Sequence, residues 1–148
     1  MFMNFWYPAE ESSQVTHEPL KVQMLGLPFV LWRDEQGQAH CVSNTCTHRG
    51  GSIGDGKVVG NCVQCPYHGW LFNGDGECER IPSLGPLDKI PPRSRIDAYP
   101  VEERYGLVFV FLGDLPEDQR PTILPIDEYN DDGWRTLRMR YRWRANYV

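Results

Sequence analysis

The chain has 148 residues, of which 41% are hydrophobic and 12% aromatic, which is enough for one domain with a hydrophobic core and too few for two ordinary domains. Its formal charge of −5 argues against nucleic acid or an anionic membrane as a partner, because both are polyanions. No window approaches the roughly 18 consecutive apolar residues of a membrane span, and the N-terminus shows no targeting signal. We expect a soluble, acidic protein.

The first part of the chain predicts a strand followed by a hairpin. Residues 2–8 are aromatic and end in proline, which indicates an irregular segment laid over a sheet or an interface. Apolar and polar residues alternate over 20–25, and a run that favours β-structure follows at 28–33. A turn at 34–37 and a return strand at 39–42 complete the hairpin.

Two further hairpins are predicted in the middle of the chain. Residues 57–64 give two short strands around a Gly-Asn turn, and residues 70–80 give another pair around the turn at 73–76. Residues 41–82 therefore form a small all-β subdomain. Four prolines within 82–92 indicate an extended connector over the surface.

The last third predicts one hairpin, a linker and a final strand. Residues 95–103 and 106–112 form the hairpin, and because 106–112 is apolar on both faces we expect it to be a central strand. Residues 113–133 carry three prolines and many acidic residues, which suits a linker. From 135 to 144 apolar residues alternate with arginines, which predicts a half-buried strand.

Two Cys–His pairs carry the chemistry of this sequence. Cys46-x-His48 and Cys65-x-x-His68 each place one thiol and one imidazole in a short loop. Structural zinc sites usually take their ligands as Cys–Cys and His–His pairs, which these spacings do not match. A [2Fe-2S] cluster needs two protein ligands per iron, and in the Rieske type two His replace two Cys on one iron. The pattern therefore predicts such a cluster, with Cys46 and Cys65 on one iron and His48 and His68 on the other.

The two motifs, Cys-Thr-His-Arg-Gly at 46–50 and Cys-Pro-Tyr-His-Gly-Trp at 65–70, resemble the N-terminal domain of Rieske non-heme iron oxygenases. The resemblance implies an all-β fold: a Rieske-type antiparallel β-sandwich over 1–134 with a small cluster-binding β subdomain. It also implies that the strand within 135–148 leads into a catalytic domain that this chain does not include. Glycines around the loops allow N–H groups to approach sulfur and turns to take positive φ: Gly50, Gly51, Gly54, Gly56 and Gly69.

The Rieske proteins of cytochrome bc complexes differ from this pattern at three positions. They carry an additional Cys in each loop, and the two form a disulfide, whereas this chain has Gly51 and Tyr67 there. They also have a Ser whose hydroxyl donates to a cluster sulfur, whereas this chain has Trp70. Without that donor the reduced cluster is less stabilised, which lowers the potential. We therefore expect a low-potential, oxygenase-like centre.

Five residues are candidates for the surroundings of the cluster. Arg49 is either a guanidinium at the cluster rim that contacts a partner or a solvated loop residue. Tyr67 either donates its hydroxyl toward a ligand sulfur or packs under the loop, and Trp70 is expected in the core. Gly50 and Gly69 complete the set.

The cysteine count is odd, and the cluster accounts for two of the five. We expect the remaining Cys41, Cys62 and Cys78 to be reduced, half-buried strand residues rather than members of a disulfide framework. Reduced thiols indicate a reducing compartment, so we expect a cytoplasmic protein.

The resemblance implies an electron-transfer role in an oxidoreductase, the terminal component of a multicomponent mono- or dioxygenase. A reductase or ferredoxin would donate electrons to this cluster, which passes them to a mononuclear non-heme iron that activates O2. The family assembles mostly as homotrimers, with the cluster of one subunit facing the iron of its neighbour. That iron needs two His and one carboxylate, and nothing places the remaining His17 and His40 together. We expect the mononuclear iron only in the missing catalytic domain.

Two alternatives belong to other functional classes. A free-standing Rieske ferredoxin would carry electrons by diffusion without any catalysis of its own. A zinc-binding interaction module would use the same four side chains for structure alone, and it would be colourless.

Overall fold

The computed structural model describes residues 3–85 and 87–141, which form eleven strands and four short 3-10 helices. The strands are β1 (Phe5–Glu11), β2 (Leu20–Met24), β3 (Leu27–Arg33), β4 (Ala39–Ser43), β5 (Lys57–Val59), β6 (Cys62–Gln64), β7 (Leu71–Phe72), β8 (Cys78–Arg80), β9 (Ala98–Tyr99), β10 (Val101–Arg104) and β11 (Leu107–Leu112). The 3-10 helices are η1 (Ser12–Gln14), η2 (Ile53–Asp55), η3 (Glu117–Gln119) and η4 (Asp127–Asn130). No helix among these residues has the length and apolar character needed to cross a lipid bilayer.

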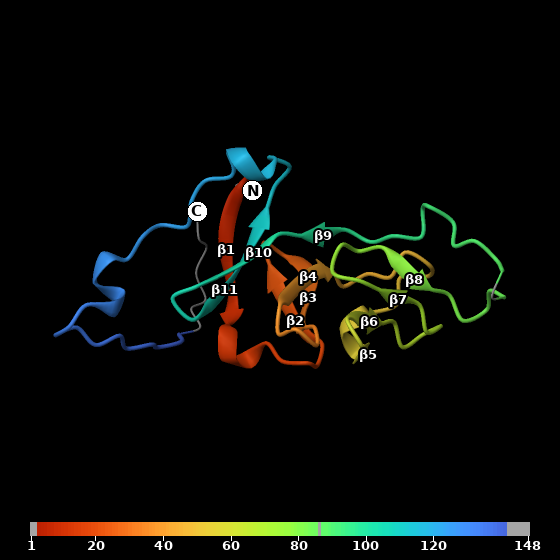
Figure 1. Ribbon diagram of the computed structural model, residues 1–148, viewed down its shortest axis with the longest axis horizontal. Helices are drawn as coiled ribbons and strands as arrows, with labels where there is room; N and C mark the ends of the chain where they lie inside the picture. Colours follow the sequence, from red (N-terminus) through yellow and green to blue (C-terminus); the bar gives the residue numbers. More distant parts are fainter. Residues whose placement is uncertain (1–2, 86, 142–148) are drawn as a thin grey trace.

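The strands form three antiparallel sheets, which confirms the predicted all-β fold. Their orders are β1-β11-β10, β2-β3-β4-β9 and β5-β6-β7-β8. The first two sheets pack together as a base, and the third lies at one end of the elongated molecule (Figure 1). The predicted hairpins within 20–42, 57–64 and 70–80 are confirmed as β2–β3–β4, β5–β6 and β7–β8.

Strand β3 separates two hydrophobic cores. Successive side chains of a strand point to opposite faces, so Phe29 and Leu31 face one layer while Val30 and Trp32 face the other. Phe29 and Leu31 pack with residues of β11 between the two base sheets. Val30 and Trp32 pack in a second core that contains the thiols of both Cys–His loops. The loops therefore rest directly on a strand whose central side chains, from Phe29 to Trp32, are buried.

The N-terminal segment is a strand, which corrects the expectation of an irregular segment over 2–8. β1 pairs antiparallel with β11, from Phe5 opposite Leu112 to Glu11 opposite Leu107. The register shifts between Pro8 and Glu10. A proline is tolerated there because β1 is an edge strand, where a missing N–H leaves the rest of the ladder intact. The partner strand lies near the other end of the chain, so local sequence does not reveal it.

The strand expected over 95–103 is divided at Pro100 into two short strands of different sheets. Ala98 and Tyr99 (β9) pair with β4, whereas β10 pairs with β11. Pro100 has no N–H to continue a ladder, but its carbonyl accepts a hydrogen bond from Phe111 N–H at 2.9 Å. The chain thus passes from one base sheet to the other at this residue. The prediction that 106–112 is central is confirmed, because β11 lies between β1 and β10.

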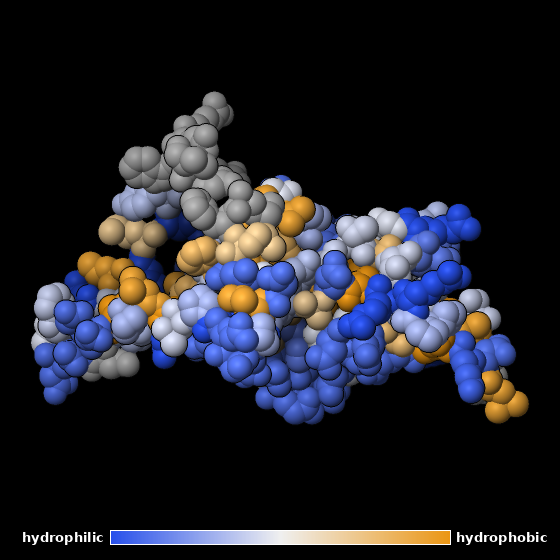
Figure 2. All heavy atoms as spheres, turned by 90° about the horizontal axis from the view of Figure 1, so that it is seen from above, coloured by the Kyte–Doolittle hydropathy of each residue, from blue (hydrophilic) through white to orange (hydrophobic). Residues whose placement is uncertain are grey.

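Residues 113–141, which we call the arm, begin against the base, where Trp6 Nε1 donates to Pro121 O at 2.7 Å, and then extend to the end of the molecule opposite the β5–β8 sheet (Figure 1). The strand expected over 135–144 is not formed over 135–141, and residues 142–144 lie outside the described part of the chain. A strand needs a neighbour for its backbone N–H and C=O groups, and the arm is held instead by side chains: Arg138 donates to Tyr105 O at 2.6 Å, and Arg140 pairs with Glu10. Most of its large apolar side chains remain exposed, as Figure 2 illustrates at this end of the molecule, whereas Ile123 is buried.

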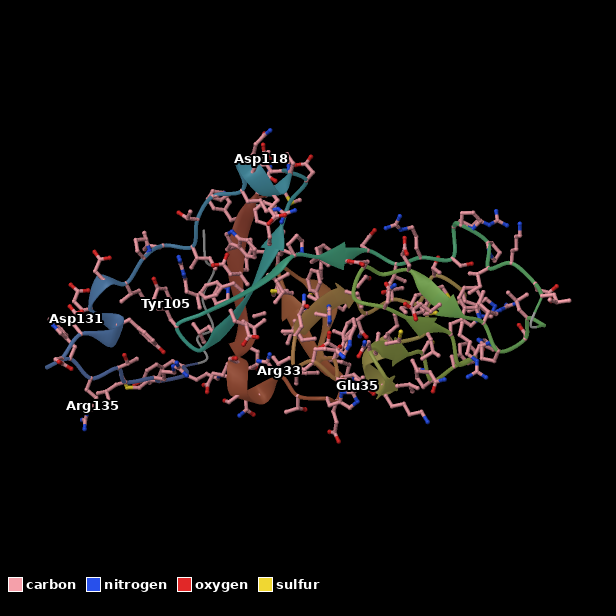
Figure 3. All side chains as sticks on the ribbon, in the orientation of Figure 1. Arg33, Glu35, Tyr105, Asp118, Asp131 and Arg135 are labelled. Atoms are coloured by element: carbon pink, nitrogen blue, oxygen red, sulfur yellow. The ribbon has the colours of Figure 1, made fainter. Side chains whose placement is uncertain are left out.

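Arg33 joins the two base sheets at their edge (Figure 3). Its Nη1 and Nη2 donate to the two carboxylate oxygens of Glu103 on β10 at 2.6 and 2.7 Å. Its Nε donates to Val15 O at 2.8 Å, and its Nη2 also donates to Ser12. A two-pronged Arg–carboxylate pair is the stronger kind of surface ion pair. Accordingly, Arg33 lowers the pKa of Glu103, although burial opposes that shift.

We expect Glu103→Gln to reduce the free energy of unfolding at neutral pH by about 1 kcal/mol, a value limited by solvent screening of a carboxylate that is 36% exposed. A carboxyl whose pKa is lowered in the folded state contributes stability above its unfolded pKa and loses it as pH falls through the folded value. The difference between wild type and variant, measured by urea unfolding, should therefore disappear in acid. Glu102→Gln is the control, because Glu102 lies 3.7 Å from Arg104 in a more exposed pair. Equal losses in both variants would contradict the prediction.

Candidate metal centre

The first Cys–His loop is closed by two backbone hydrogen bonds. Cys46 N–H donates to Gly51 O at 2.9 Å, and Gly50 N–H donates back to Cys46 O at 2.8 Å. Gly50 has φ of 69°, a conformation that residues with a Cβ rarely adopt. The loop therefore turns tightly around the Cys46 thiol and presents His48 at its tip.

The second loop repeats this arrangement. Cys65 N–H donates to Trp70 O at 2.9 Å, and Gly69 N–H donates to Cys65 O at 3.0 Å. Gly69 has φ of 74°, and a Cβ there would come within 3.0 Å of Pro82. The spacing differs by one residue, since His68 follows Cys65 by three positions. The predicted glycines Gly50 and Gly69 thus have equivalent roles in the two loops.

Asn44 anchors the first loop, a role that the sequence analysis did not identify. Its side-chain Oδ1 accepts a hydrogen bond from Gly54 N–H at 2.6 Å, and its Nδ2 donates to Ser52 Oγ at 3.1 Å. Its backbone carbonyl accepts from Ile53 N–H at 3.1 Å. Asn44 therefore ties the end of β4 to the far side of the loop. The sequence feature that could have revealed this role is an Asn next to a glycine-rich loop, because Asn side chains in loops commonly form hydrogen bonds with backbone groups.

The two thiols lie together beneath the loops. Cys46 and Cys65 are 3% and 2% exposed and belong to the same core. Burial, with the adjacent Cys65 thiol, raises the pKa of Cys46 to about 11, while N–H groups of His48 and Arg49 directed at its sulfur oppose that rise. Those N–H groups are the kind of donor that stabilises a metal-bound thiolate.

The two imidazoles lie together at the surface above the thiols. The ring centroids of His48 and His68 are 4.5 Å apart at an interplanar angle of 65°. Both side chains are exposed. Partial loss of water around the ring, together with the charges of His68 and Arg49, lowers the pKa of His48. The neutral imidazole, which is the metal-binding form, is therefore favoured.

The surrounding candidates divide into exposed and half-buried residues. Arg49 is exposed and close enough to repel the protonated form of His48. Tyr67 is 63% exposed with its ring 4.0 Å from that of His68, so it does not pack under the loop. Trp70, expected in the core, is half-buried at the core's edge, with one face on His48.

The other histidines have structural partners. His17 Nδ1 lies 3.0 Å from Arg33 O. His40 Nε2 lies 2.8 Å from Asp34 Oδ2. Burial of the Asp34 carboxyl acts to raise its pKa. Hydrogen bonds from His40 and from the backbone N–H groups of Gln38 and Gln36 outweigh that effect, so the pKa of Asp34 is lowered. Both histidines thus have bonds expected of ordinary loop and strand residues.

The three remaining cysteines are free and lie on strands, as expected, but they are buried rather than half-buried. Cys41 lies on β4, and burial raises the pKa of its thiol. Cys62 on β6 donates to Glu79 Oε2 at 3.3 Å. Burial, followed by that carboxylate, raises the pKa of Cys62 to about 12. Cys78 lies on β8, where burial also raises its pKa.

The geometry matches a cluster with two protein ligands per iron better than a single ion. Within residues 3–85 and 87–141, no three His, Cys, Asp or Glu side chains are placed to hold one metal ion. A tetrahedral zinc ion would require four such groups around one point. Two separate pairs are present instead: buried Cys46 with Cys65, and exposed His48 with His68. A cluster that spans the space between the pairs satisfies both.

Comparison with known proteins agrees with this geometry. Residues 5–92 match the Rieske [2Fe-2S] domain. The iron-sulfur subunit TsaM1 of the toluene-4-sulfonate monooxygenase system of Comamonas testosteroni is 34% identical over 145 residues, which are 97% of this chain and 41% of that protein. Chlorophyllide a oxygenase of Chlamydomonas reinhardtii is 42% identical over 120 residues, which are 80% of this chain and 18% of that protein.

Solved structures agree as well. Apo dicamba monooxygenase matches with a TM-score of 0.72 and 31% identity, covering 80% of this chain and 37% of that one. NdmA of Pseudomonas putida CBB5 matches with a TM-score of 0.75 and 30% identity, covering 86% of this chain and 39% of that one.

An antiparallel β-sandwich with two Cys–His loops at one end defines a class of iron–sulfur electron-transfer domains. The chain belongs to the Rieske [2Fe-2S] domain family, and its relatives include Rieske oxygenases. Its cofactor is accordingly a Rieske-type [2Fe-2S] cluster. The chain spans less than half the length of these relatives.

Proposed function

We propose that the chain transfers electrons as the N-terminal domain of the terminal oxygenase of a multicomponent Rieske system. The observation that carries the proposal is the pairing of two buried thiols beneath two exposed imidazoles in loops of equivalent backbone geometry. Cys46 and Cys65 hold one iron, and His48 and His68 hold the other. When bound, the cluster accepts and releases one electron at a time.

The protein residues have separate tasks in this arrangement. The buried thiolates keep one iron away from water, and N–H groups of the first loop stabilise the Cys46 sulfur. The imidazoles of His48 and His68 would hold the other iron, and because both rings are exposed they are accessible to a docked partner. Arg49, exposed beside them, is available to a negatively charged group on that partner.

The proposed partners are a reductase or ferredoxin that donates electrons and a mononuclear non-heme iron that receives them. The names of the relatives support this: one is an iron-sulfur subunit of a monooxygenase system and another an oxygenase subunit of 3-chlorobenzoate-3,4-dioxygenase. This chain covers 41% and 35% of those two proteins. We therefore propose that the receiving iron belongs to a catalytic domain, in this polypeptide or in a neighbouring subunit of a homotrimer. The three buried cysteines outside the proposed cluster site are not in disulfides, which supports a cytoplasmic location.

The test uses the 148-residue chain reconstituted anaerobically with iron and sulfide. We expect two irons and two sulfides per chain, a brown protein, an EPR signal after one-electron reduction, and reoxidation by an added acceptor without product when O2 and aromatic compounds are supplied. A colourless protein with bound zinc would refute the cluster. A third iron with oxygenated product would show that this chain holds a catalytic site of its own and would refute its assignment as an electron-transfer domain alone. Reduction by a donor protein but no exchange with any oxygenase domain would favour the free-standing ferredoxin.

A further inference from the structure

A tryptophan from one loop stacks on a histidine from the other. The rings of Trp70 and His48 are nearly parallel, with an interplanar angle of 6° and centroids 4.6 Å apart. Tyr67, by contrast, is tilted by 35° against His68, its neighbour in sequence. The parallel stack therefore joins the imidazole of the first loop to the second loop, in addition to the tilted contact between His48 and His68.

The fold holds the indole in place independently of His48. The Trp70 carbonyl closes the second loop by accepting the Cys65 N–H. The indole packs against the core and lies 6.3 Å from the ring of Phe72, which is completely buried. Because one side of Trp70 is anchored, its other side presents a fixed flat surface to His48.

We propose that Trp70 is a positioning residue that orients the His48 imidazole and lowers the reduction potential of the cluster. This inference rests on the proposed role of His48 as an iron ligand. The face of an indole carries the negative part of its quadrupole, so it attracts a positively polarised ring. A ligand imidazole is more positive when the iron is oxidised, so the stack favours the oxidised state.

Exclusion of water acts in the same direction. The indole covers one face of an imidazole that is otherwise exposed. Reduction adds one negative charge to the centre, and water stabilises added charge better than an apolar ring does. Removing the indole should therefore raise the potential through both effects.

This effect of the indole on the potential is separate from the effect of lacking a hydroxyl donor at position 70. If a missing donor alone explained a low potential, every apolar side chain at this position would give the same value, since none donates to sulfur. The stack predicts a difference between aromatic and aliphatic replacements. Trp70→Phe retains a ring face, Trp70→Leu retains bulk without a π system, and Trp70→Ala retains neither.

The experiment is a redox titration of the holoprotein with EPR detection. At the wild-type midpoint, we expect the reduced-to-oxidised ratio to rise about three- to tenfold in Trp70→Ala, the scale of an aromatic contact, where tenfold is about 59 mV for one electron. Trp70→Phe should stay near wild type, and Trp70→Leu should lie between. The EPR g values should change in Trp70→Ala and Trp70→Leu but not in Trp70→Phe. Trp134→Ala, at an exposed position in the arm, is the matched control and should leave both readouts unchanged.

The outcomes separate this inference from the proposed function. Equal potentials in all loaded Trp70 variants, or Trp70→Phe behaving like Trp70→Leu, would overturn the role of the stack while leaving the cluster assignment intact. If Trp70→Ala fails to retain iron, the comparison of Trp70→Phe with Trp70→Leu still decides. Failure of the wild-type chain to form a cluster would instead refute the proposed function.

Discussion

Replacement of Cys46, His48, Cys65 or His68 by Ala is expected to abolish the brown colour and the bound iron. Each change removes one of four protein ligands, and a buried or partly buried cluster with an incomplete ligand set is not retained. Any residual iron should be found in the His48→Ala and His68→Ala variants, because water can reach the exposed imidazole positions, whereas the two thiols lie in the core at 3% and 2% exposure. The visible spectrum and the iron content of each purified variant measure the effect.

The matched controls are Ser replacements of the three other cysteines. Cys62→Ser can still donate to Glu79, so it should keep the colour. Cys41→Ser places a hydroxyl where the residue is fully buried, at a cost of about 1–3 kcal/mol, so it should be less stable but still brown. Cys78→Ser should also load iron. A colourless Cys62→Ser protein beside a coloured Cys46→Ala protein would overturn the ligand assignment.

Gly56→Ala should destabilise the fold and disturb the second Cys–His loop. A Cβ at this position would overlap the backbone carbonyl oxygen of Gln64, the residue that immediately precedes Cys65. Backbone cannot move aside as a flexible side chain can, so β6 and the second loop would have to shift. We expect a loss of about 3 kcal/mol in the free energy of unfolding, measured by urea unfolding, together with reduced iron content.

Gly60→Ala is the control variant. It separates the steric overlap at Gly56 from the backbone strain of placing a side chain at positive φ. Gly60 has φ of 58° in the β5–β6 turn, and an added Cβ would have no atom within 4 Å. Its replacement should cost about 1–2 kcal/mol from the left-handed backbone alone and should leave iron content normal. Equal effects on iron binding at Gly56 and Gly60 would mean that the contact with Gln64 is not what matters.

Short-range features of this protein were predictable because adjacent residues determine them. The two Cys–His spacings, the Gly60-Asn61 turn and the alternation over 20–25 each depend on a few consecutive residues. The central position of 106–112 also followed from local sequence, since a strand apolar on both faces has to be covered on both. The candidate ligands and their glycines could therefore be named from the sequence alone.

Long-range features required the tertiary structure because the partner decides them. Residues 5–11 become a strand through pairing with β11, which lies at the far end of the chain. Residues 135–141 have a strand-like pattern but pair with none of the strands in the described part of the chain, so they stay irregular. The alternation of apolar residues indicates which face of a segment could be buried. The backbone hydrogen bonds that make the segment a strand depend on whether another strand lies beside it.

The surroundings of the candidate cluster show the same division. Sequence determined that Cys46, His48, Cys65 and His68 belong to two similar loops. It did not determine that the thiols are buried and the imidazoles exposed, that Asn44 closes the first loop, or that Trp70 faces His48. Those facts depend on how the β5–β8 sheet packs on β3, which brings the two loops face to face. The candidate ligands can be named from residues that are adjacent in the sequence, whereas their burial and their contacts depend on tertiary packing.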